Sequence, residues 1–495
     1  MEQVFDVAII GGGINGCGAA ADAALRGLSV VLLEKDDLAS KTSSSSSKLI
    51  HGGLRYLEYY DFALVKKALD ERQLLLSLAP NLVHPLPFVL PYQRNMRPTW
   101  LLRTGLFFYD NLSRKNKLPR SKLIKRTQQS PYFLPLIDSY KKGFLFYDCT
   151  TDDSRLTIAN ALQAKEQGAT ILTGTELTHS RTIENIWHLT AKAKNGQEQV
   201  IKAKSIINAS GPWVEFINNL LAIPNHFKMS LVKGSHMVVH KLYEGNHAYL
   251  LQHIDKRIVF LVPYHGYTMI GTTDVAFDGS LDEVNISSEE IGYLFELVNH
   301  YFNCQLERKN IINTWSGVRP LLATEGEDLK ALSRDYAFSY TKTPAPAVTI
   351  YGGKITTYRQ SSLEAVNQLH PVFPHLEPSQ SKSKPLPGST FNNWSYRDYL
   401  HHAREKYFWL DESLRERYFT CYGTRTELLL EGCTKMSELG QDFGHGLYQI
   451  EVDYLIQEEW ARNCDDILWR RTKLGLNFEP LNKKLLAEYL EHTLA

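Results

Sequence analysis

Three glycines near the N-terminus have the spacing that a dinucleotide-binding turn requires. Gly11, Gly13 and Gly16 follow an apolar run directly and precede an alanine-rich stretch. The first glycine permits a tight turn, the second lets the backbone approach a pyrophosphate, and the third lets a helix pack closely against a strand. Ile14 and Asn15 lie between the second and third glycines, next to the helix N-terminus that would hold the phosphates, so both are cofactor-binding candidates.

An acidic residue stands where a nucleotide ribose would bind. Glu34 lies 18 residues beyond Gly16, at the tip of the apolar run 29–33. A carboxylate in that place can accept hydrogen bonds from both hydroxyls of an adenosine ribose, and Lys35 beside it is a second candidate. The order of elements is a strand, the glycines, a helix of small residues, a second strand and an acid. This order favours dinucleotide binding over a plain glycine turn, but it does not distinguish NAD from FAD.

Hydroxyl, glycine and cationic residues are concentrated in residues 42–56. A flexible serine linker is the simplest interpretation of such a stretch. That interpretation is weak here, because the serines run straight into an apolar and aromatic Gly-Gly segment inside a nucleotide-binding half.

The same segment closely matches the hallmark of a known family. The stretch Ser46-Ser-Lys-Leu-Ile-His-Gly-Gly-Leu-Arg-Tyr56 resembles that of the aerobic, flavin-dependent glycerol-3-phosphate dehydrogenases. Further segments that resemble the family follow in order at 208–213, 233–236, 271–274, 316–320, 333–335, 352–359, 442–445 and 465–472. The resemblance therefore covers the whole chain and not only its nucleotide-binding part.

The resemblance implies FAD as the cofactor and names further residues that would hold it. The turn that follows the strand 205–208 would lie near the pyrophosphate, although alone it could end any buried strand. The Gly352–Gly353 turn would lie beside the flavin ring. The implied residues are Thr42, Ser43, Ser44, Ser46, Ser47, Lys48, His51, Gly52, Gly53, Ala209, Gly211, Gly353, Lys354 and Thr356.

Oxidation of a secondary alcohol requires a hydride acceptor, a group that takes the hydroxyl proton, and groups that hold the substrate. A phosphate on the substrate calls for arginine, since guanidinium binds phosphate oxygens in pairs. Arg55, Arg319 and Arg334 are the candidates, although without the resemblance the last two could be routine surface ion pairs. The predicted substrate-binding set also contains Tyr56, Thr272 and Lys354.

Three residues could accept the hydroxyl proton. His51 and His236 qualify because the pKa of histidine lies near neutrality, and Lys354 qualifies if desolvation lowers its pKa. Arg319 completes the predicted catalytic set, but arginine cannot readily act as a base at neutral pH. A lone histidine is more often structural, yet His51 and Lys354 each border a Gly-Gly turn, and the choice among the three stays open.

The elements that must position these residues indicate a discontinuous α/β fold. A strand at 4–10, a helix at 17–26 and a strand at 29–34 form a βαβ unit. A capped helix at 152–168 with a strand at 169–173 forms a second unit. The run 348–352 is again an apolar strand that ends in glycine, as at the N-terminus. Runs at 236–240, 257–262 and 267–272 suit an inserted antiparallel sheet.

A chain of 495 residues exceeds what one core normally serves, so two or three domains are expected. We predict a Rossmann-like FAD-binding domain, an inserted antiparallel-sheet substrate-binding domain, a polar Pro/Ser-rich linker and a C-terminal α-helical domain. Their predicted bounds are 1–75, 145–220 and 345–372 for the first, 76–144 and 221–344 for the second, 373–388 for the linker and 389–495 for the last.

Composition argues against several other classes. A formal net charge of +1 is unlike a dedicated nucleic-acid binder, which needs a basic excess. The six cysteines lie far apart without metal-ligand spacing, so no metal is expected and a reducing cytosol fits best. The run 4–10 lacks the basic start and the length of a signal peptide, and no run reaches the roughly 18 apolar residues of a membrane span.

An aromatic-rich helix at 100–112 precedes a basic segment at 114–126. This order suits an amphipathic helix that lies in the headgroup region of an anionic membrane. A core helix followed by a solvated basic loop is an equal alternative. The resemblance favours peripheral attachment to the cytoplasmic face of the inner membrane without identifying the contact, and it allows a homodimer.

The expected activity is the oxidation of glycerol 3-phosphate to dihydroxyacetone phosphate, with FAD as hydride acceptor and a membrane quinone as the final acceptor. An oxidase that reduces dioxygen is a second possibility, although such relatives tend to be longer. An amine or amino-acid oxidase would need a carboxylate clamp but not three arginines and a lysine. A non-catalytic flavoprotein would have no use for these cations.

Overall fold

The computed structural model describes residues 3–93, 98–128, 130–253, 255, 257–323, 335–391 and 394–494, and for Arg55, Glu58 and Tyr59 it describes the backbone alone. The N-terminal part is the predicted βαβ unit. β1 (Val4–Ile10) and β2 (Val30–Leu33) pair in parallel, and α1 (Ile14–Leu25) connects them. The helix begins three residues before the predicted start, because the glycine turn itself forms its N-terminus.

The first sheet gathers strands from distant parts of the chain, so the nucleotide-binding fold is discontinuous as predicted. Its order is β17-β18-β10-β1-β2-β7, with the β8–β9 hairpin added through β10. The path from β18 to β7 is parallel, and β17 and β9 join antiparallel. The additional strands are β7 (Thr170–Leu172), β8 (Thr175–Ile183), β9 (Ile186–Ala193), β10 (Glu198–Asn208), β17 (Tyr336–Thr341) and β18 (Ala347–Gly352).

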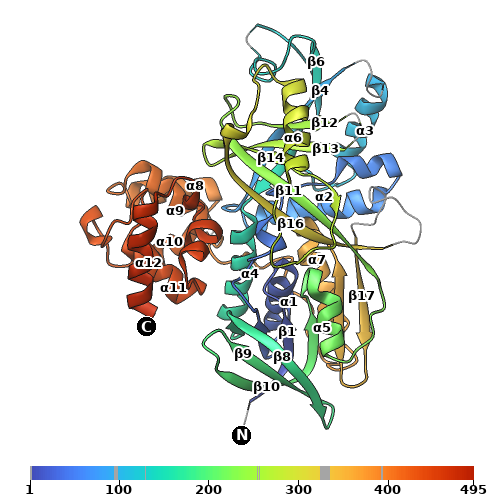
Figure 1. Ribbon diagram of the computed structural model, residues 1–495, viewed down its shortest axis with the longest axis vertical. Coiled ribbons are helices and arrows are strands. Elements are labelled where there is room, and N and C mark those ends of the chain that lie inside the picture. The colour runs from blue at the N-terminus through green and yellow to red at the C-terminus, as the bar shows by residue number, and fades with distance from the viewer. Residues whose placement is uncertain are drawn as a thin grey trace.

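Three helices pack together beside this sheet (Figure 1). α1 contacts α4 (Asp153–Glu166) and α7 (Tyr358–Asn367), and its alanines allow the close approach. Asp152 caps α4 by accepting a hydrogen bond from the Arg155 N–H, which is the capped helix that the sequence predicts.

The second sheet forms the opposite half of the molecule (Figure 1). It has ten strands in the order β15-β11-β14-β13-β12-β4-β6-β3, with β16 on β11 and β5 on β6. Every neighbour is antiparallel except the β12–β4 pair. Its strands are β3 (Leu49–Ile50), β4 (Val83–Tyr92), β5 (Lys122–Lys125), β6 (Lys142–Thr151), β11 (Met229–His240), β12 (Ala248–Gln252), β13 (Ile258–Tyr264), β14 (Tyr267–Gly271), β15 (Val275–Ala276) and β16 (Ile311–Leu322).

The inserted, mostly antiparallel sheet agrees with the prediction. Two strands differ from the predicted domain bounds. The bound at 145 falls inside β6, which belongs to the second sheet throughout, and β17 belongs to the first sheet although it precedes the bound at 345. The helices associated with this half are α2 (Phe62–Leu78), α3 (Thr99–Asn111) and α6 (Ser288–Tyr301).

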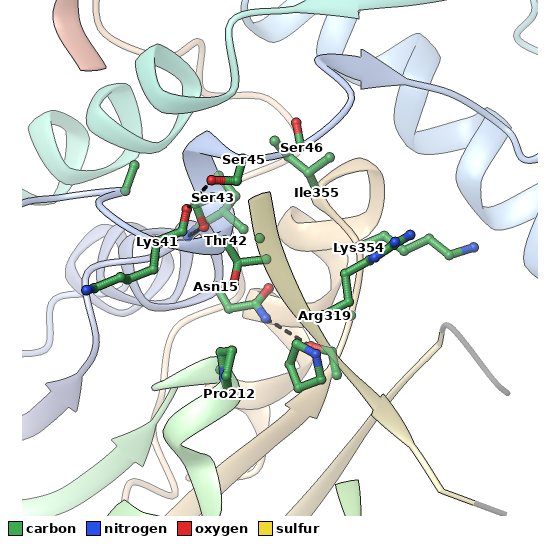
Figure 2. Close-up of a pocket in the computed structure, with 18 of the residues that line it drawn as sticks. Asn15, Lys41, Thr42, Ser43, Ser45, Ser46, Pro212, Arg319, Lys354 and Ile355 are labelled. Carbon is green, nitrogen blue, oxygen red and sulfur yellow. Dashed lines mark hydrogen bonds between the residues drawn. The ribbon is translucent and has the colours of Figure 1, made fainter. Parts of the chain in front are cut away.

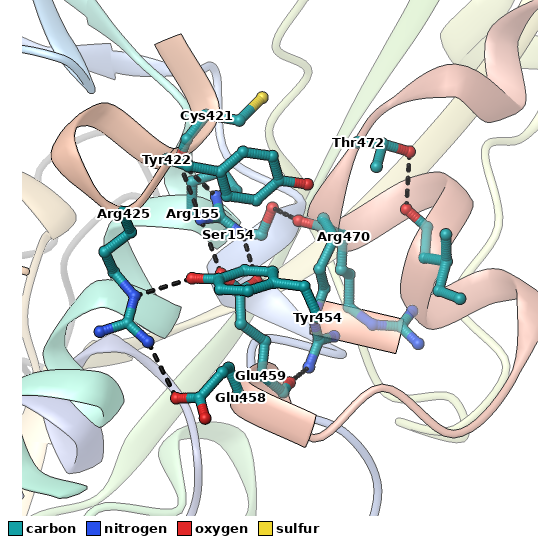
Figure 3. Close-up of polar contacts among 12 residues, drawn as sticks. Ser154, Arg155, Cys421, Tyr422, Arg425, Tyr454, Glu458, Glu459, Arg470 and Thr472 are labelled. Atoms are coloured by element: carbon teal, nitrogen blue, oxygen red, sulfur yellow. Dashed lines mark hydrogen bonds and ion pairs between the residues drawn. The ribbon is translucent and has the colours of Figure 1, made fainter. Parts of the chain in front are cut away.

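The C-terminal residues form the predicted helical domain with a hydrophobic core of its own. Its helices are α8 (Tyr396–Lys406), α9 (Glu412–Tyr422), α10 (Thr426–Leu429), α11 (Gln449–Glu459) and α12 (Pro480–Leu494). The domain lies beside α4 (Figure 1). Figure 3 shows the contact, where Arg155 of α4 donates to Glu459 at 2.9 Å and to the Cys421 carbonyl at 2.8 Å. This buried polar contact fixes the domain against the nucleotide-binding half.

Candidate functional site

A cavity of about 620 Å³ lies between the two sheets. The glycine turn, the serine-rich loop 40–47, the turn 209–213 and the Gly352–Gly353 turn line it on the side of the first sheet. Residues of β6, β11, β13 and β16 line it on the other side. Parts of the chain that are far apart in sequence therefore meet around one space.

The glycine turn has the geometry that its spacing predicts. Gly11 has φ +109°, a conformation that side chains rarely allow. A Cβ atom on Gly16 would overlap the Gly11 carbonyl, so the close packing of α1 on β1 requires glycine there. The Ile14 N–H at the start of α1 donates to Ser43 Oγ at 2.9 Å, which ties the serine loop to the turn.

Glu34 occupies the predicted place at the end of β2. Its carboxylate accepts hydrogen bonds from the backbone N–H groups of Gly12 at 2.6 Å and Asp36 at 2.8 Å. Burial raises the pKa of the Glu34 carboxyl, and the two backbone donors oppose this change. Glu34 also lines the cavity, so the carboxylate is held in position beside the space that a nucleotide would fill.

These residues fit FAD. Gly11 and Gly13 line the cavity beside the α1 N-terminus and carry no side chain, which leaves room for an approaching pyrophosphate. In the first turn of α1, Asn15 Nδ2 donates to the Gly352 carbonyl at 3.2 Å (Figure 2). Asn15 Oδ1 is buried and has no hydrogen-bond partner in the part of the chain that the structure describes, which suits a donor on a bound ligand.

The serine-rich loop is held in place by bonds within the protein. Thr42 Oγ1 donates to the Val318 carbonyl at 2.7 Å, and Ser46 Oγ donates to Asp153 at 2.7 Å. Lys48 forms a buried ion pair with Asp153 at 2.8 Å. The loop is therefore a fixed part of the cavity wall and not a flexible linker.

Most of the predicted site residues line the cavity. These are Gly11, Gly13, Ile14, Asn15, Glu34, Lys35, Thr42, Ser43, Ser46, Ser47, His51, Gly53, Tyr56, Ala209, Gly211, His236, Thr272, Arg319, Gly353, Lys354 and Thr356. Gly16, Ser44, Lys48 and Gly52 are not among the lining residues. The side chain of Arg55 and all of Arg334 lie outside the described residues, so their roles stay predictions.

Cations and a histidine meet at one end of the cavity. Arg319 on β16 donates from Nη2 to the Thr273 carbonyl and lies 2.8 Å from Asp274. A Cβ atom on Gly234 would overlap its guanidinium and would lie 2.5 Å from Thr272 Oγ1, so glycine at 234 leaves room for both groups. Lys354 Nζ lies 3.9 Å from the centre of the Tyr56 ring. Figure 2 shows Arg319 and Lys354 on one side of the cavity and the serine-rich loop on the other.

His236 on β11 is buried in the wall of the cavity beside these cations. Its Nε2 lies 2.9 Å from Ser47 Oγ, and its ring stacks on Trp315 with 5.5 Å between centroids. Nδ1 has no hydrogen-bond partner within the described ranges. Burial, and then the nearby charges of Lys48 and Arg319, lower the pKa of His236 well below 6.5. The imidazole is therefore neutral at pH 7.

Sequence reasoning missed several lining residues. Asp148 on β6 and Phe260 on β13 face the cavity near His51, whose ring lies 6.0 Å from that of Phe260. At the opposite end, Lys41 and Asp282 line the cavity and pair at 3.1 Å. Strand alternation could have placed Asp148 and Phe260 on one face of the second sheet, but no local signal connects them to this cavity.

The described ranges contain no cluster of histidine, cysteine and acidic residues that could hold a metal ion. The six cysteines are free thiols. Within the same ranges no helix is long and apolar enough to cross a membrane.

Comparisons with known proteins cover nearly the whole chain. Residues 6–357 match the model of the FAD dependent oxidoreductase family, and residues 379–491 match the C-terminal domain of alpha-glycerophosphate oxidase. A glycerol-3-phosphate dehydrogenase of Pseudomonas aeruginosa is 46% identical over 495 residues, which covers 99% of this chain and 96% of the relative. A D-erythritol 1-phosphate dehydrogenase of Brucella abortus is 42% identical over 494 residues, covering 99% and 98%.

A solved structure has the same fold. The glycerol-3-phosphate dehydrogenase of Bacillus halodurans, complexed with FAD, aligns over 100% of this chain and 95% of its own, with a TM-score of 0.75. At 24% sequence identity this likeness bears on the fold alone.

Proposed function

The chain belongs to the family of FAD-dependent glycerol-3-phosphate dehydrogenases, and on this premise we propose that it oxidises sn-glycerol 3-phosphate to dihydroxyacetone phosphate. The electrons pass to FAD and then to a respiratory quinone. The observation that carries the proposal is the meeting of Arg319, Lys354 and neutral His236 at the end of the cavity beside the Gly352–Gly353 turn.

The cations suit a phosphorylated substrate. Arg319 is held by Thr273 and Asp274, so its guanidinium has a fixed direction before substrate arrives. A fixed guanidinium can bind two phosphate oxygens at once, and Lys354 adds a second positive charge at the same end of the cavity. Arg55 and Arg334 remain in the proposed phosphate-binding set.

The histidine suits proton removal. FAD, when bound, supplies the hydride acceptor. His236 is neutral, and we assign it the role of accepting the hydroxyl proton of the substrate. Ser47, whose hydroxyl lies 2.9 Å from the ring, holds the imidazole in position. His51 and Lys354 line the same cavity and stay the alternative acceptors. Phe260 and Leu250 add apolar side chains to the wall of the same cavity.

Anaerobic mixing of the FAD-loaded protein with substrate tests the proposal directly, because reduction of the flavin needs no second acceptor. Glycerol 3-phosphate should bleach the flavin absorbance near ~450 nm, whereas glycerol and lactate, which lack a phosphate, should not. Flavin that stays oxidised with glycerol 3-phosphate would contradict the proposed substrate. Adding a quinone or dioxygen to the reduced protein then identifies the acceptor.

A second substrate deserves the same experiment. The relative from Brucella abortus is named for D-erythritol 1-phosphate and is nearly as similar to this chain as the glycerol-3-phosphate dehydrogenase. Both substrates combine a phosphate with a secondary alcohol, so the same cations would serve both. Comparing kcat/KM for the two compounds decides between them, and a higher value for D-erythritol 1-phosphate would displace the leading proposal.

We further propose that the protein attaches to the cytoplasmic face of an anionic membrane through α3. Trp100, Phe107 and Phe108 of this helix are 68%, 60% and 43% exposed, and only Leu106 and Tyr109 are buried. This exposure argues against the core-helix alternative. The basic segment 114–126 follows directly and would meet anionic headgroups, and a membrane-bound quinone would then be within reach.

A further inference from the structure

A buried polar cluster borders the cavity, which one of its members, Asp148, lines. It joins Arg72 on α2, Tyr109 on α3 and Asp148 on β6, and all three are at most 4% exposed. Arg72 Nη1 lies 2.5 Å from Asp148 Oδ1, and the Tyr109 hydroxyl donates to the same carboxylate at 2.8 Å. A buried carboxylate with two such donors is held firmly in one place.

The Tyr109 hydroxyl also accepts a hydrogen bond from the backbone N–H of Gly52, at 2.8 Å. Burial and the Asp148 charge raise the pKa of Tyr109 well above its usual value, so the hydroxyl keeps its proton and can donate and accept at once. The Gly52 N–H also lies 3.4 Å from Asp148 Oδ1, so Tyr109 gives the shorter of two contacts between this amide and the buried cluster.

Gly52 lies in a turn whose neighbouring residues line the cavity. His51 before it and Gly53 after it both line the cavity, and Gly53 has φ +74°. A Cβ atom on Gly52 would lie 2.8 Å from the Tyr109 hydroxyl oxygen, so the turn is pressed directly against this tyrosine. Any change in the place of the hydroxyl would move the backbone that carries the His51 side chain.

We propose that Tyr109 is a positioning residue for the reaction. Its hydroxyl, fixed by Asp148 and Arg72, holds the Gly52 amide and thereby sets the direction of His51 and Gly53 at the substrate end of the cavity. No proton or electron passes through Tyr109. The inference rests on the proposed oxidation of a polyol phosphate at this site.

The Tyr109→Phe variant tests the inference, because it removes one oxygen atom and keeps the ring. Without the Tyr109 oxygen the buried Gly52 N–H keeps only its longer contact of 3.4 Å with Asp148 Oδ1, so the turn shifts. A small displacement of reacting groups slows a reaction much more than it weakens binding, and we expect the rate constant of anaerobic flavin reduction to fall about tenfold. The substrate concentration for half-maximal rate should change by less than about twofold, with FAD retained.

Tyr249→Phe is the matched control. The Tyr249 hydroxyl is buried in the second sheet and donates to the Tyr132 carbonyl at 3.0 Å, but Tyr249 does not line the cavity. This variant should lose a similar amount of thermal stability and leave the rate constant unchanged. Equal rate constants for wild type and Tyr109→Phe, or equal losses in both variants, would overturn the inference.

The flavin absorption spectrum separates this inference from the proposed function. If the wild-type protein is not bleached by glycerol 3-phosphate, the substrate assignment fails, and the spectrum of the oxidised flavin then decides on Tyr109. A band that shifts in Tyr109→Phe and not in Tyr249→Phe supports the positioning role. A band that is the same in all three proteins overturns it.

Discussion

At the residue scale, the site depends on side chains whose charge is fixed before any ligand binds. Arg319 lies 2.8 Å from Asp274, and a carboxylate partner offsets part of the attraction of a guanidinium for an anion. The arginine nevertheless lines the cavity. Its role is therefore to present a directed fork to a phosphate, a task that lysine could not perform equally well.

Arg319→Ala should raise KM strongly and leave FAD bound. Loss of a charge-assisted pair of hydrogen bonds costs about 2–4 kcal/mol, which corresponds to a rise in KM of roughly 30-fold or more. Steady-state kinetics with glycerol 3-phosphate measures the change, and Arg319→Lys is the control that keeps the charge and loses the fork. Kinetics equal to those of wild type would contradict phosphate binding by this residue.

Glu34→Ala should lower the FAD content of the purified protein. The carboxylate organises the Gly12 and Asp36 amides and faces the cavity, so its loss removes the ribose contact and loosens the turn. Flavin absorbance per protein measures occupancy, and Glu34→Gln keeps the shape as a control. Full occupancy in the alanine variant would contradict the ribose role.

At the scale of the elements, the sequence predicts the nucleotide-binding part well because its signals are local. The glycine turn, the strands β1 and β2 and the cap of α4 are each determined by residues that are adjacent in the chain. β4 was not predicted, since Pro85, Pro87 and Pro91 argue against a strand. It forms all the same, because tertiary packing in the second sheet outweighs local preference.

The site itself is less predictable than the strands. Ser47 and His236 are separated by 189 positions, yet they form one hydrogen bond. Local pattern shows each as a candidate but not that they meet, because the register of β11 in the second sheet depends on long-range pairing. Tyr109 shows the same limit, since nothing near it in the chain indicates Gly52 as its partner.

The exposed aromatic side chains of α3 lead to a prediction about membrane attachment. The double change Trp100→Ser with Phe107→Ser removes two large side chains, each worth about 1.5–3 kcal/mol when buried in lipid. Binding to vesicles that contain anionic lipid should fall by at least about tenfold. Flotation of vesicles with the FAD-loaded protein measures the bound fraction.

Phe408→Ser provides the control for that experiment, because Phe408 is 77% exposed and lies in the C-terminal domain. It should bind vesicles as wild type does. Equal binding by all three proteins would contradict a membrane contact through α3, and equal loss in both variants would indicate a general effect of surface hydrophobicity.

Ion pairs between the loop before α6 and the nucleotide end of the cavity lead to a separate prediction about cofactor release. Asp282 pairs with Lys35 at 2.8 Å and with Lys41 at 3.1 Å, and these two lysines flank the Trp213 ring. All four residues line the cavity, so the pairs connect the two halves across its edge. Exposed pairs contribute little singly, and we expect Asp282→Asn to speed FAD release by about threefold at low salt.

The rise in FAD fluorescence after dilution of the loaded protein measures this release. The difference from wild type should vanish near ~1 M salt, since screening removes the attraction between exposed charges. Glu283→Gln makes the same charge change one residue away and should have no effect. Release that is equally fast in both variants would show that the pairs do not retain the cofactor.

At the scale of the whole molecule, the C-terminal domain is attached to the nucleotide-binding half by buried charges. Arg155 and Glu459 are buried on the two sides of the contact, and Arg471 pairs with Asp37 beside it. Arg155 also supplies donors to the Cys421 carbonyl. The contact is therefore specific in geometry, even though buried ion pairs add little net stability over well-packed apolar groups.

A double-mutant cycle tests this account. Glu459→Leu alone leaves the Arg155 charge buried without its partner and should lower stability by about 3–5 kcal/mol. The double change with Arg155→Leu removes that unpaired charge, so it should recover part of the loss, while the unsatisfied Cys421 carbonyl keeps recovery incomplete. Denaturant unfolding followed by tryptophan fluorescence measures each step. Arg155→Leu on its own completes the cycle. A loss in the double variant equal to the sum of the losses in the two single variants would show that the charges contribute independently, and the domain would then be held by its apolar contacts and not by this pair.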